Sequence, residues 1–304
     1  MTMIDVRGLT KRYGLDTVVD DLSFTVEAGQ VTGFLGPNGA GKSTTMKMIL
    51  GLAAPTAGSV SVGGRRYRDL PAPLTEVGAL LDAGAVHGGR KARDHLLALA
   101  VGNGLPRRRV DEVLARTGLE NVAHKRAGAF SLGMRQRLGI AAALLGDPRV
   151  LIFDEPVNGL DPEGIRWIRD FMRSLAREGR AVLVSSHLMS EMAQTADHLV
   201  VIGRGRLIAD MGVAEFLRDR GEGTVLVRTA EPDAFALQLT ATGATVREGP
   251  GSALVVSGLA SEEIGKLAAY HGTVLSELTP QRPSLEDAFM ELTRDSVEYQ
   301  GVTA

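Results

Sequence analysis

The stretch from Gly36 to Ser43, GPNGAGKS, has the composition of a phosphate-binding loop. It fits the spacing G-x-x-x-x-G-K-[ST], in which glycines let successive backbone N–H groups turn toward phosphate oxygens. Lys42 supplies a positive charge for the outer phosphates, and the Ser43 hydroxyl is a ligand type that Mg²⁺ accepts. The predicted phosphate-binding residues are Gly36, Pro37, Asn38, Gly39, Ala40, Gly41, Lys42, Ser43 and Thr44.

Two carboxylates and one histidine stand at the ends of later apolar runs. VLIFDE ends in Asp154 and Glu155, and AVLVSSH ends in His187. Doubly wound sheets bind ligands at the carboxyl ends of their strands, so these side chains are expected to share one rim. Asp154 is predicted to hold Mg²⁺, Glu155 to orient and polarise an attacking water, and His187 to donate to a transition-state oxygen.

Each of these assignments has a plainer alternative. Glu155 could cap a loop before Pro156, and lone histidines are more often structural than catalytic. The structural interpretation is adopted for the remaining histidines, which are His87, His95, His124, His198 and His271. His187 differs because the end of its strand is expected to lie beside Asp154.

A mainly parallel sheet is needed to hold these groups. The runs 149–156 and 180–187 are nearly continuous apolar stretches, as in strands buried on both faces, and residues 161–179 between them have helical character. Asp161 is placed to cap that helix, Pro162 suits its first turn, and Gly179 can end it. Short strands are predicted near the N-terminus at 3–10, 18–29, 30–36 and 58–64, and helices at 91–104, 106–119 and 131–147.

The pattern changes after about residue 215. Strands are predicted at 223–232, 244–258 and 272–280, with helices at 233–243, 261–272 and 283–296. The sequence therefore predicts two domains: an α/β domain at 1–218, with a helical insertion at about 84–146, and a small α+β domain at 219–304.

Composition excludes several other classes of protein. The net charge of −2 and the lack of a long basic stripe argue against nucleic acid as a partner. The absence of cysteine excludes disulfides and thiolate metal sites. The N-terminus has no signal-peptide pattern, and no segment has 18 charge-free apolar residues. A cytoplasmic protein is expected, so that another chain must supply any membrane span.

Four motifs in order resemble the nucleotide-binding subunit of an ABC transporter. They are GPNGAGKST, SLGMRQR, LIFDEPVNGLDP and SSH, and the resemblance covers residues 4 to about 215. FSLGMRQRLGIA is similar to the signature of ABC-2 type drug- and bacteriocin-export ATPases, and LTPQRPSLEDAFMELT resembles the appendage of antibiotic-resistance exporters. The resemblance implies a P-loop ABC ATPase core with an antiparallel β subdomain, and ATP and Mg²⁺ as cofactors.

The resemblance also implies further binding residues. Tyr13 would stack on adenine with Val18 beside it, although Tyr13 could be an ordinary exposed tyrosine. Ser131 and Gly133 would contact the γ-phosphate of ATP held by a second copy, in a head-to-tail homodimer with Asp161 at the seam. Asp161 can cap its helix at the same time.

The chain departs from the family pattern at two places. Phe130, Leu132 and Met134 replace the usual first, third and fifth signature residues, while the phosphate-facing pair remains. Asp82 stands where the family usually has Gln, and it is expected either to bind Mg²⁺ or to be a solvated loop residue.

The resulting hypothesis is an ATPase that drives export of a drug, antibiotic or lipid-like cargo. It would lie on the inner face of the cell membrane beneath a separate multispanning permease, with the region around Asp82 to His95 in contact with that permease. The alternatives are an ABC ATPase acting on ribosome or DNA, and a nucleotide-gated scaffold without turnover. The chain has neither a second such domain nor a basic face, which disfavours the first alternative.

Overall fold

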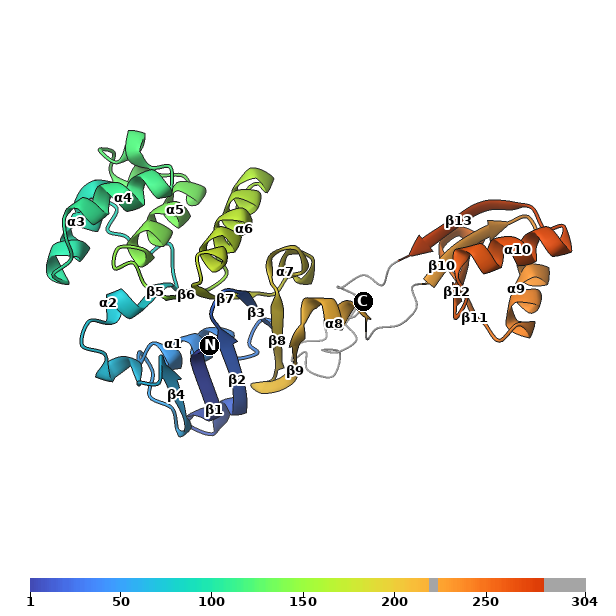
Figure 1. Cartoon of the computed structure of the whole chain (residues 1–304), viewed down its shortest axis with the longest axis horizontal. Helices are drawn as coiled ribbons and strands as arrows, with labels where there is room; N and C mark the ends of the chain where they lie inside the picture. Colours follow the sequence, from blue (N-terminus) through green and yellow to red (C-terminus); the bar gives the residue numbers. More distant parts are fainter. Residues whose placement is uncertain (219–223, 282–304) are drawn as a thin grey trace. The chain divides into compact units, whose positions relative to one another are not determined.

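A computed structural model describes residues 1–218 and 224–281 of the chain (Figure 1). These residues form two compact units, one comprising Met1–Val213 and one that begins at Ala214. The division falls five residues before the boundary predicted from the sequence. The C-terminal helix predicted at 283–296 lies outside the described residues.

The first unit is built around a six-stranded sheet in the order β5-β6-β7-β3-β8-β9. Neighbouring strands are parallel throughout except for β9, which runs antiparallel to β8. The strands are β3 (Val31–Leu35), β5 (Val77–Leu80), β6 (Val150–Phe153), β7 (Ala181–Ser186), β8 (His198–Gly203) and β9 (Arg206–Gly212). All residues of β3, β6 and β7 are buried, so the predicted burial on both faces is confirmed.

A three-stranded antiparallel sheet packs against the six-stranded sheet near β3. Its order is β2-β1-β4, from β1 (Thr2–Tyr13), β2 (Asp16–Glu27) and β4 (Ala57–Val62). The rings of Phe24 on β2 and Phe34 on β3 stack with centroids 5.2 Å apart and join the two sheets. Each buried phenylalanine contributes roughly 1.5–3 kcal/mol by leaving water.

Helices connect the parallel strands and cover the sheet. The connections are α1 (Lys42–Ile49) after β3, α6 (Pro162–Arg177) between β6 and β7, and α7 (Met189–Thr195) between β7 and β8. Asp161 caps α6 by accepting a hydrogen bond from the Gly164 N–H at 2.9 Å, and Pro162 occupies its first turn. Gly179 follows with φ 88°, so the predicted start and stop of this helix are confirmed.

The helical insertion lies between β5 and β6. It contains α3 (Ala92–Gly102), α4 (Arg108–Arg116) and α5 (Leu132–Ala143), which group together at one end of the sheet in Figure 1. α5 packs on β5, where Gly139 faces the Leu80 side chain closely enough that a Cβ would lie 2.5 Å from it. The short α2 (Pro73–Glu76) precedes β5, and α8 (Val213–Arg218) follows β9.

The second unit alternates strands and helices in the order β-α-β-β-α-β, the split βαβ arrangement of ferredoxin-like folds. Its strands β10 (Thr224–Thr229), β11 (Thr245–Glu248), β12 (Leu254–Ser257) and β13 (Leu275–Gln281) form an antiparallel sheet ordered β11-β12-β10-β13. The helices α9 (Pro232–Ala241) and α10 (Ser261–His271) bury Phe235, Leu239 and Ile264 against it. The single strand predicted at 244–258 is instead a hairpin, because Gly251 takes φ 63° and turns the chain.

Within the described ranges, no helix is both long enough and apolar enough to cross a bilayer.

Candidate nucleotide-binding site

The loop from Gly36 to Gly41 joins β3 to α1 and is shaped by close backbone contacts. Gly39 and Gly41 have φ of 82° and 99°, a conformation that side chains with a Cβ rarely adopt. A Cβ on Gly36 would lie 2.5 Å from the Ile202 carbonyl oxygen, and one on Gly41 would lie 2.7 Å from that of Val18. Glycine is therefore required at both ends of this loop. The Ala40 N–H donates to the Pro37 carbonyl at 3.2 Å, and the N–H groups of Gly39 and Gly41 are left to face an anion.

The loop forms one wall of a cavity of about 310 Å³. Opposite walls come from the segments after β6 and β7, so the predicted rim of strand ends is present. The lining residues are Val18, Asn38 to Thr44, Glu155, Asn158 and His187. Phosphate-binding and acid–base groups thus share one cavity, although they are up to about 150 residues apart in the chain.

Lys42 is buried at the start of α1, with its side chain 6% exposed. Its Nζ donates to the carbonyl oxygens of Gly36 at 2.7 Å and Pro37 at 3.2 Å, and it lies 3.6 Å from Glu155 Oε1. Burial lowers the pKa of Lys42, while the Glu155 and Asp154 carboxylates oppose that shift. The amine is thus held over the loop in a position from which phosphate oxygens can replace the two carbonyls.

The backbone of Glu155 is held in an unusual conformation. Its φ is 48°, in the left-handed region that a non-glycine residue enters at a cost of about 1–3 kcal/mol. The Glu155 N–H donates to Ser185 Oγ at 2.8 Å, and Ser185 Oγ donates in turn to Asp154 Oδ1 at 2.5 Å. Ser185, buried in β7, therefore links the Asp154 side chain to the Glu155 backbone, and the Glu155 side chain lines the cavity.

The imidazole of His187 faces the same carboxylate. Its Nδ1 lies 2.9 Å from Glu155 Oε2, so Glu155 touches His187 with one oxygen and faces Lys42 with the other. A lysine, a carboxylate and an imidazole in line beside a phosphate loop can bind an anion and move the proton of a nearby water.

Of the three residues predicted to hold magnesium, Ser43 and Asp154 lie near the phosphate loop. Ser43 is exposed in the cavity, and Asp154 lies close enough to Lys42 for its charge to act on that amine. Hydroxyl and carboxylate oxygens are the donors that Mg²⁺ prefers, so this pair fits such an ion. In the described part of the chain, no three acidic or histidine side chains cluster as a complete metal cage.

Asp82, by contrast, is not brought to this cavity. It follows β5, the edge strand beside β6, and it is not among the residues that line the cavity. Its Oδ1 accepts a hydrogen bond from the Gly84 N–H at 2.6 Å, and Asp82 lines a different, more apolar groove. This arrangement gives no support to Asp82 as a metal ligand and agrees with the alternative of a loop residue.

The residues predicted to hold adenine lie along the hairpin of β1 and β2. Val18 lines the cavity, and Tyr13 is 51% exposed at the end of β1. The Tyr13 ring has one face occupied by Lys11, whose Nζ lies 4.8 Å from the ring centroid. Tyr13 does not line the cavity itself.

Ser131, Gly133 and Asp161 lie outside the cavity and near one another. Ser131 caps α5 by accepting from the Met134 N–H at 3.3 Å, as Asp161 caps α6. The two caps are linked by packing, since a Cβ on Gly159 would lie 2.7 Å from the Leu132 side chain. Both side chains are exposed, so this chain's own phosphate loop does not use them.

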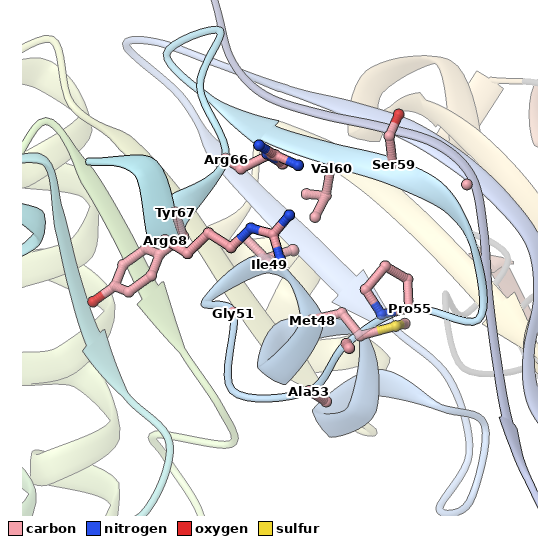
Figure 2. Close-up of a pocket in the computed structure, with 12 residues that line it drawn as sticks. Met48, Ile49, Gly51, Ala53, Pro55, Ser59, Val60, Arg66, Tyr67 and Arg68 are labelled. Carbon is pink, nitrogen blue, oxygen red and sulfur yellow. The ribbon is translucent and has the colours of Figure 1, made fainter.

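A second cavity, of about 380 Å³, lies at the opposite end of α1 (Figure 2). Met48, Ile49 and Val60 form an apolar floor, and Arg66 and Arg68 stand at its edge. None of the described residues that line it is a carboxylate or a histidine. This cavity therefore lacks an acid–base pair, and the candidate catalytic site is the cavity at the phosphate loop.

Comparison with known proteins decides the family. Residues 19–158 match the family model described as ABC transporter. The chain is 37% identical over 303 residues to the uncharacterized ABC transporter ATP-binding protein YhcH of Bacillus subtilis (strain 168), covering 98% of each chain. The chain belongs to the ABC transporter ATP-binding proteins.

Other members of this ABC family agree over most of the chain. The bacitracin transport ATP-binding protein BcrA of Bacillus licheniformis is 36% identical over 299 residues, covering 96% of this chain and 97% of BcrA. A solved structure described as the ATP binding subunit of an ABC transporter has 30% identity and a TM-score of 0.62, and covers 72% of this chain. The predicted family, ABC ATPase fold and ATP-hydrolysing transport function are confirmed. Residues 223–286 match a domain of unknown function.

Two residues of this ABC ATPase site were not evident from its sequence. Ser185, which is hydrogen-bonded to both acidic residues, is the first serine of VSSH and is hidden in a run that reads only as a buried strand. Asn158 lines the cavity from the segment after Glu155. A buried strand that ends in two hydroxyls, Ser185 and Ser186, beside a strand that ends in two adjacent acids is the signal that could have identified Ser185.

Proposed function

We propose that this ABC ATPase powers the export of an antibiotic-like cargo through a separate membrane subunit. The observation that carries the proposal is similarity to the bacitracin transport ATP-binding protein across 96% of this chain, including the C-terminal unit. A match confined to the ATPase core would support only nucleotide hydrolysis. No observation favours action on ribosome or DNA.

In the proposed mechanism, Lys42 and the loop amides bind the outer phosphates of ATP. Glu155, whose Oε1 lies 3.6 Å from the Lys42 amine, orients the attacking water and accepts its proton. His187 donates to an oxygen of the γ-phosphate as charge develops there. Ser43 and Asp154 would hold Mg²⁺, which would neutralise negative charge on the phosphates.

The proposed active unit is a head-to-tail homodimer. Ser131 presents the N-terminus of α5, a twelve-residue helix, and its outward position suits a phosphate held by a second copy. Asp161, fixed beside it through Leu132 and Gly159, would lie at the seam. Two-fold symmetry then gives two equivalent sites, each with the phosphate loop of one copy and the capped helix of the other.

Mixing two inactive variants tests this arrangement. Lys42→Ala and Ser131→Arg should each be inactive alone, because every site in either homodimer has a defect. An equal mixture should recover about a quarter of wild-type phosphate release, since half of the dimers would be mixed and each would hold one intact site. Ser131→Arg also removes a helix cap worth about 1 kcal/mol, so its melting temperature must be compared with wild type.

No recovery from two folded variants would contradict the shared site. Gly133→Glu provides a second variant, because it places bulk and negative charge where the γ-phosphate should lie without removing the Ser131 cap.

The proposed contact with the membrane subunit is the groove between β5 and the helical insertion. This groove of about 400 Å³ is lined by apolar side chains such as Leu52, Leu81 and Val86, together with Asp82 and His95. Leu52 is 68% exposed, and the buried Nδ1 of His95 has no hydrogen-bond partner among the described residues. A cytoplasmic segment of the permease, on the inner face of the membrane, would cover Leu52 with apolar residues and give His95 Nδ1 a hydrogen-bond partner.

Transport itself is tested in a bacitracin-sensitive bacterium. The chain is co-expressed with a candidate multispanning permease, and the inhibitory concentration of bacitracin is measured. Resistance should rise several-fold with wild type and not with Lys42→Ala. No rise with an active ATPase and an inserted permease would reject bacitracin as cargo, and the same strains then screen other peptide antibiotics.

A further inference from the structure

Two stacked aromatic rings lie beside the buried face of α6. Trp167 and Phe171 are one helical turn apart, with ring centroids separated by 4.9 Å and an angle of 13° between the ring planes. Both side chains are only half-buried, whereas the residues that α6 buries are Ile168, Met172, Leu175 and Ala176. Burial in the core therefore does not account for this pair, and the groups that cover the rings have to explain it.

Two arginines of the helical insertion cover the rings. The guanidinium carbon of Arg137, on α5, lies 3.9 Å from the Trp167 ring centroid, and that of Arg116, the last residue of α4, lies 5.8 Å from the Phe171 centroid. A cation over an aromatic face is attracted by the ring, and more strongly where water is partly excluded. These four side chains therefore join the insertion to α6, and α5 and α6 stand side by side in Figure 1.

The Arg137 contact is the better defined of the two. Its Nη1 donates to the Thr117 carbonyl oxygen at 3.2 Å, at the end of α4. A Cβ on Gly118 would lie 3.1 Å from the same Nη1, so the guanidinium has little room to leave the ring. Arg116 is further from its ring and is also paired with Glu178. Arg137 and Trp167 thus form the tighter link between the insertion and α6.

This link lies equally far along each helix from the residue that caps it. Arg137 is six residues after Ser131, and Trp167 is six residues after Asp161, which is about 9 Å of helix in each case. The two helices also meet at their caps, through the packing of Leu132 described above. Two contacts about 9 Å apart set the tilt of α5 against α6, whereas the contact at the caps alone would act as a pivot.

We infer that Arg137 and Trp167 are positioning residues that hold Ser131 in place for the phosphate bound by a second copy. Neither residue lines the cavity at the phosphate loop, so their contact acts on the shared site only through the N-terminus of α5. A displacement on the order of 1 Å in a group that contacts the reacting phosphate can lower turnover about a hundredfold. This inference rests on the proposed head-to-tail homodimer.

The first test replaces each member of the contact in turn. Trp167→Leu keeps an apolar side chain without an aromatic face, so an ATP analogue should bind within about twofold of wild type while kcat falls about fivefold or more. Trp167→Tyr keeps a ring for the guanidinium and should retain most of the turnover. Arg137→Met should match Trp167→Leu, and the double variant should be no slower than either single one. Arg166→Met, an exposed neighbour on α6, is the matched control and should behave as wild type.

Mixing variants then shows which half of the shared site is damaged. An equal mixture of Trp167→Leu and Lys42→Ala should recover about a quarter of wild-type phosphate release, because each mixed dimer pairs one intact loop with one intact Ser131 helix. A mixture of Trp167→Leu and Ser131→Arg should release no more than the mean of the two alone, because both variants lack a well-placed helix. Arg137→Met goes through the same mixtures, so the test stands even if Trp167→Leu does not fold.

The outcomes separate this inference from the proposed dimer. Recovery in the mixture of Lys42→Ala with Ser131→Arg, beside wild-type kcat in Trp167→Leu and Arg137→Met, would overturn the role of this contact alone. No recovery in that mixture would overturn the shared site and this inference with it. Melting temperatures are measured for every variant. A kcat that falls together with the melting temperature, with no recovery beside Lys42→Ala, would mean that the contact is only structural and would also overturn the inference.

Discussion

Replacing Lys42 by alanine is expected to abolish ATP turnover, lowering kcat/KM about a hundredfold or more. The Lys42 side chain carries the cation nearest the loop, and its Nζ is directed there by the Gly36 and Pro37 carbonyls at 2.7 and 3.2 Å. Alanine removes that charge and leaves Glu155 without its cation 3.6 Å away. Binding of a fluorescent ATP analogue and steady-state phosphate release would both be measured.

Lys47→Ala is the matched control for this variant, because Lys47 lies on the same helix with its side chain exposed. It should bind and hydrolyse ATP as wild type does. Lys42→Arg retains the charge but enlarges a buried group, and it is expected to remain inactive. Unchanged hydrolysis in a folded Lys42→Ala would refute the assignment of the phosphate loop.

Replacing Glu155 by glutamine is expected to separate nucleotide binding from turnover. Glutamine preserves the size of the side chain and can accept hydrogen bonds, but it cannot take a proton from water, so turnover should fall by about 10²–10⁴. ATP should still bind, and the nucleotide should remain clamped between two copies. Size-exclusion chromatography with ATP and magnesium should therefore show a stable dimer, which wild type reaches only transiently.

Glu163→Gln provides the control, since Glu163 is an exposed acid in the first turn of α6. It should neither stabilise the dimer nor slow turnover. A Glu155→Gln protein that binds ATP yet elutes only as a monomer would count against the clamped dimer. A variant that hydrolyses ATP at the wild-type rate would remove Glu155 from the catalytic role.

The parts of this site that were predictable depend on short segments with strong local rules. The glycines of the loop mark positions where a Cβ would meet the Ile202 or Val18 carbonyl. Apolar runs ending in Asp154, Glu155 and His187 imply buried parallel strands, and parallel strands place their carboxyl ends on one rim. Chain order and strand type thus suffice to gather groups that are distant in sequence.

The unpredicted features depend on tertiary placement. Asp82 follows a strand like those before Glu155 and His187, but only the folded chain shows that it lines a different groove. β5 itself is four residues long and carries little signal. Ser185 matters through its hydrogen bonds to Asp154 and Glu155 on another element, which a single sequence does not identify.

The left-handed backbone at Glu155 sets the stability of the fold against the catalytic role proposed for this residue. Asparagine tolerates φ 48° better than glutamate does, so it would relax strain on the order of 1 kcal/mol at this position. It would also shorten the acid and neutralise it. Selection for thermal stability alone would therefore favour variants that no longer hydrolyse ATP. Glutamate is expected at this position only under selection for transport.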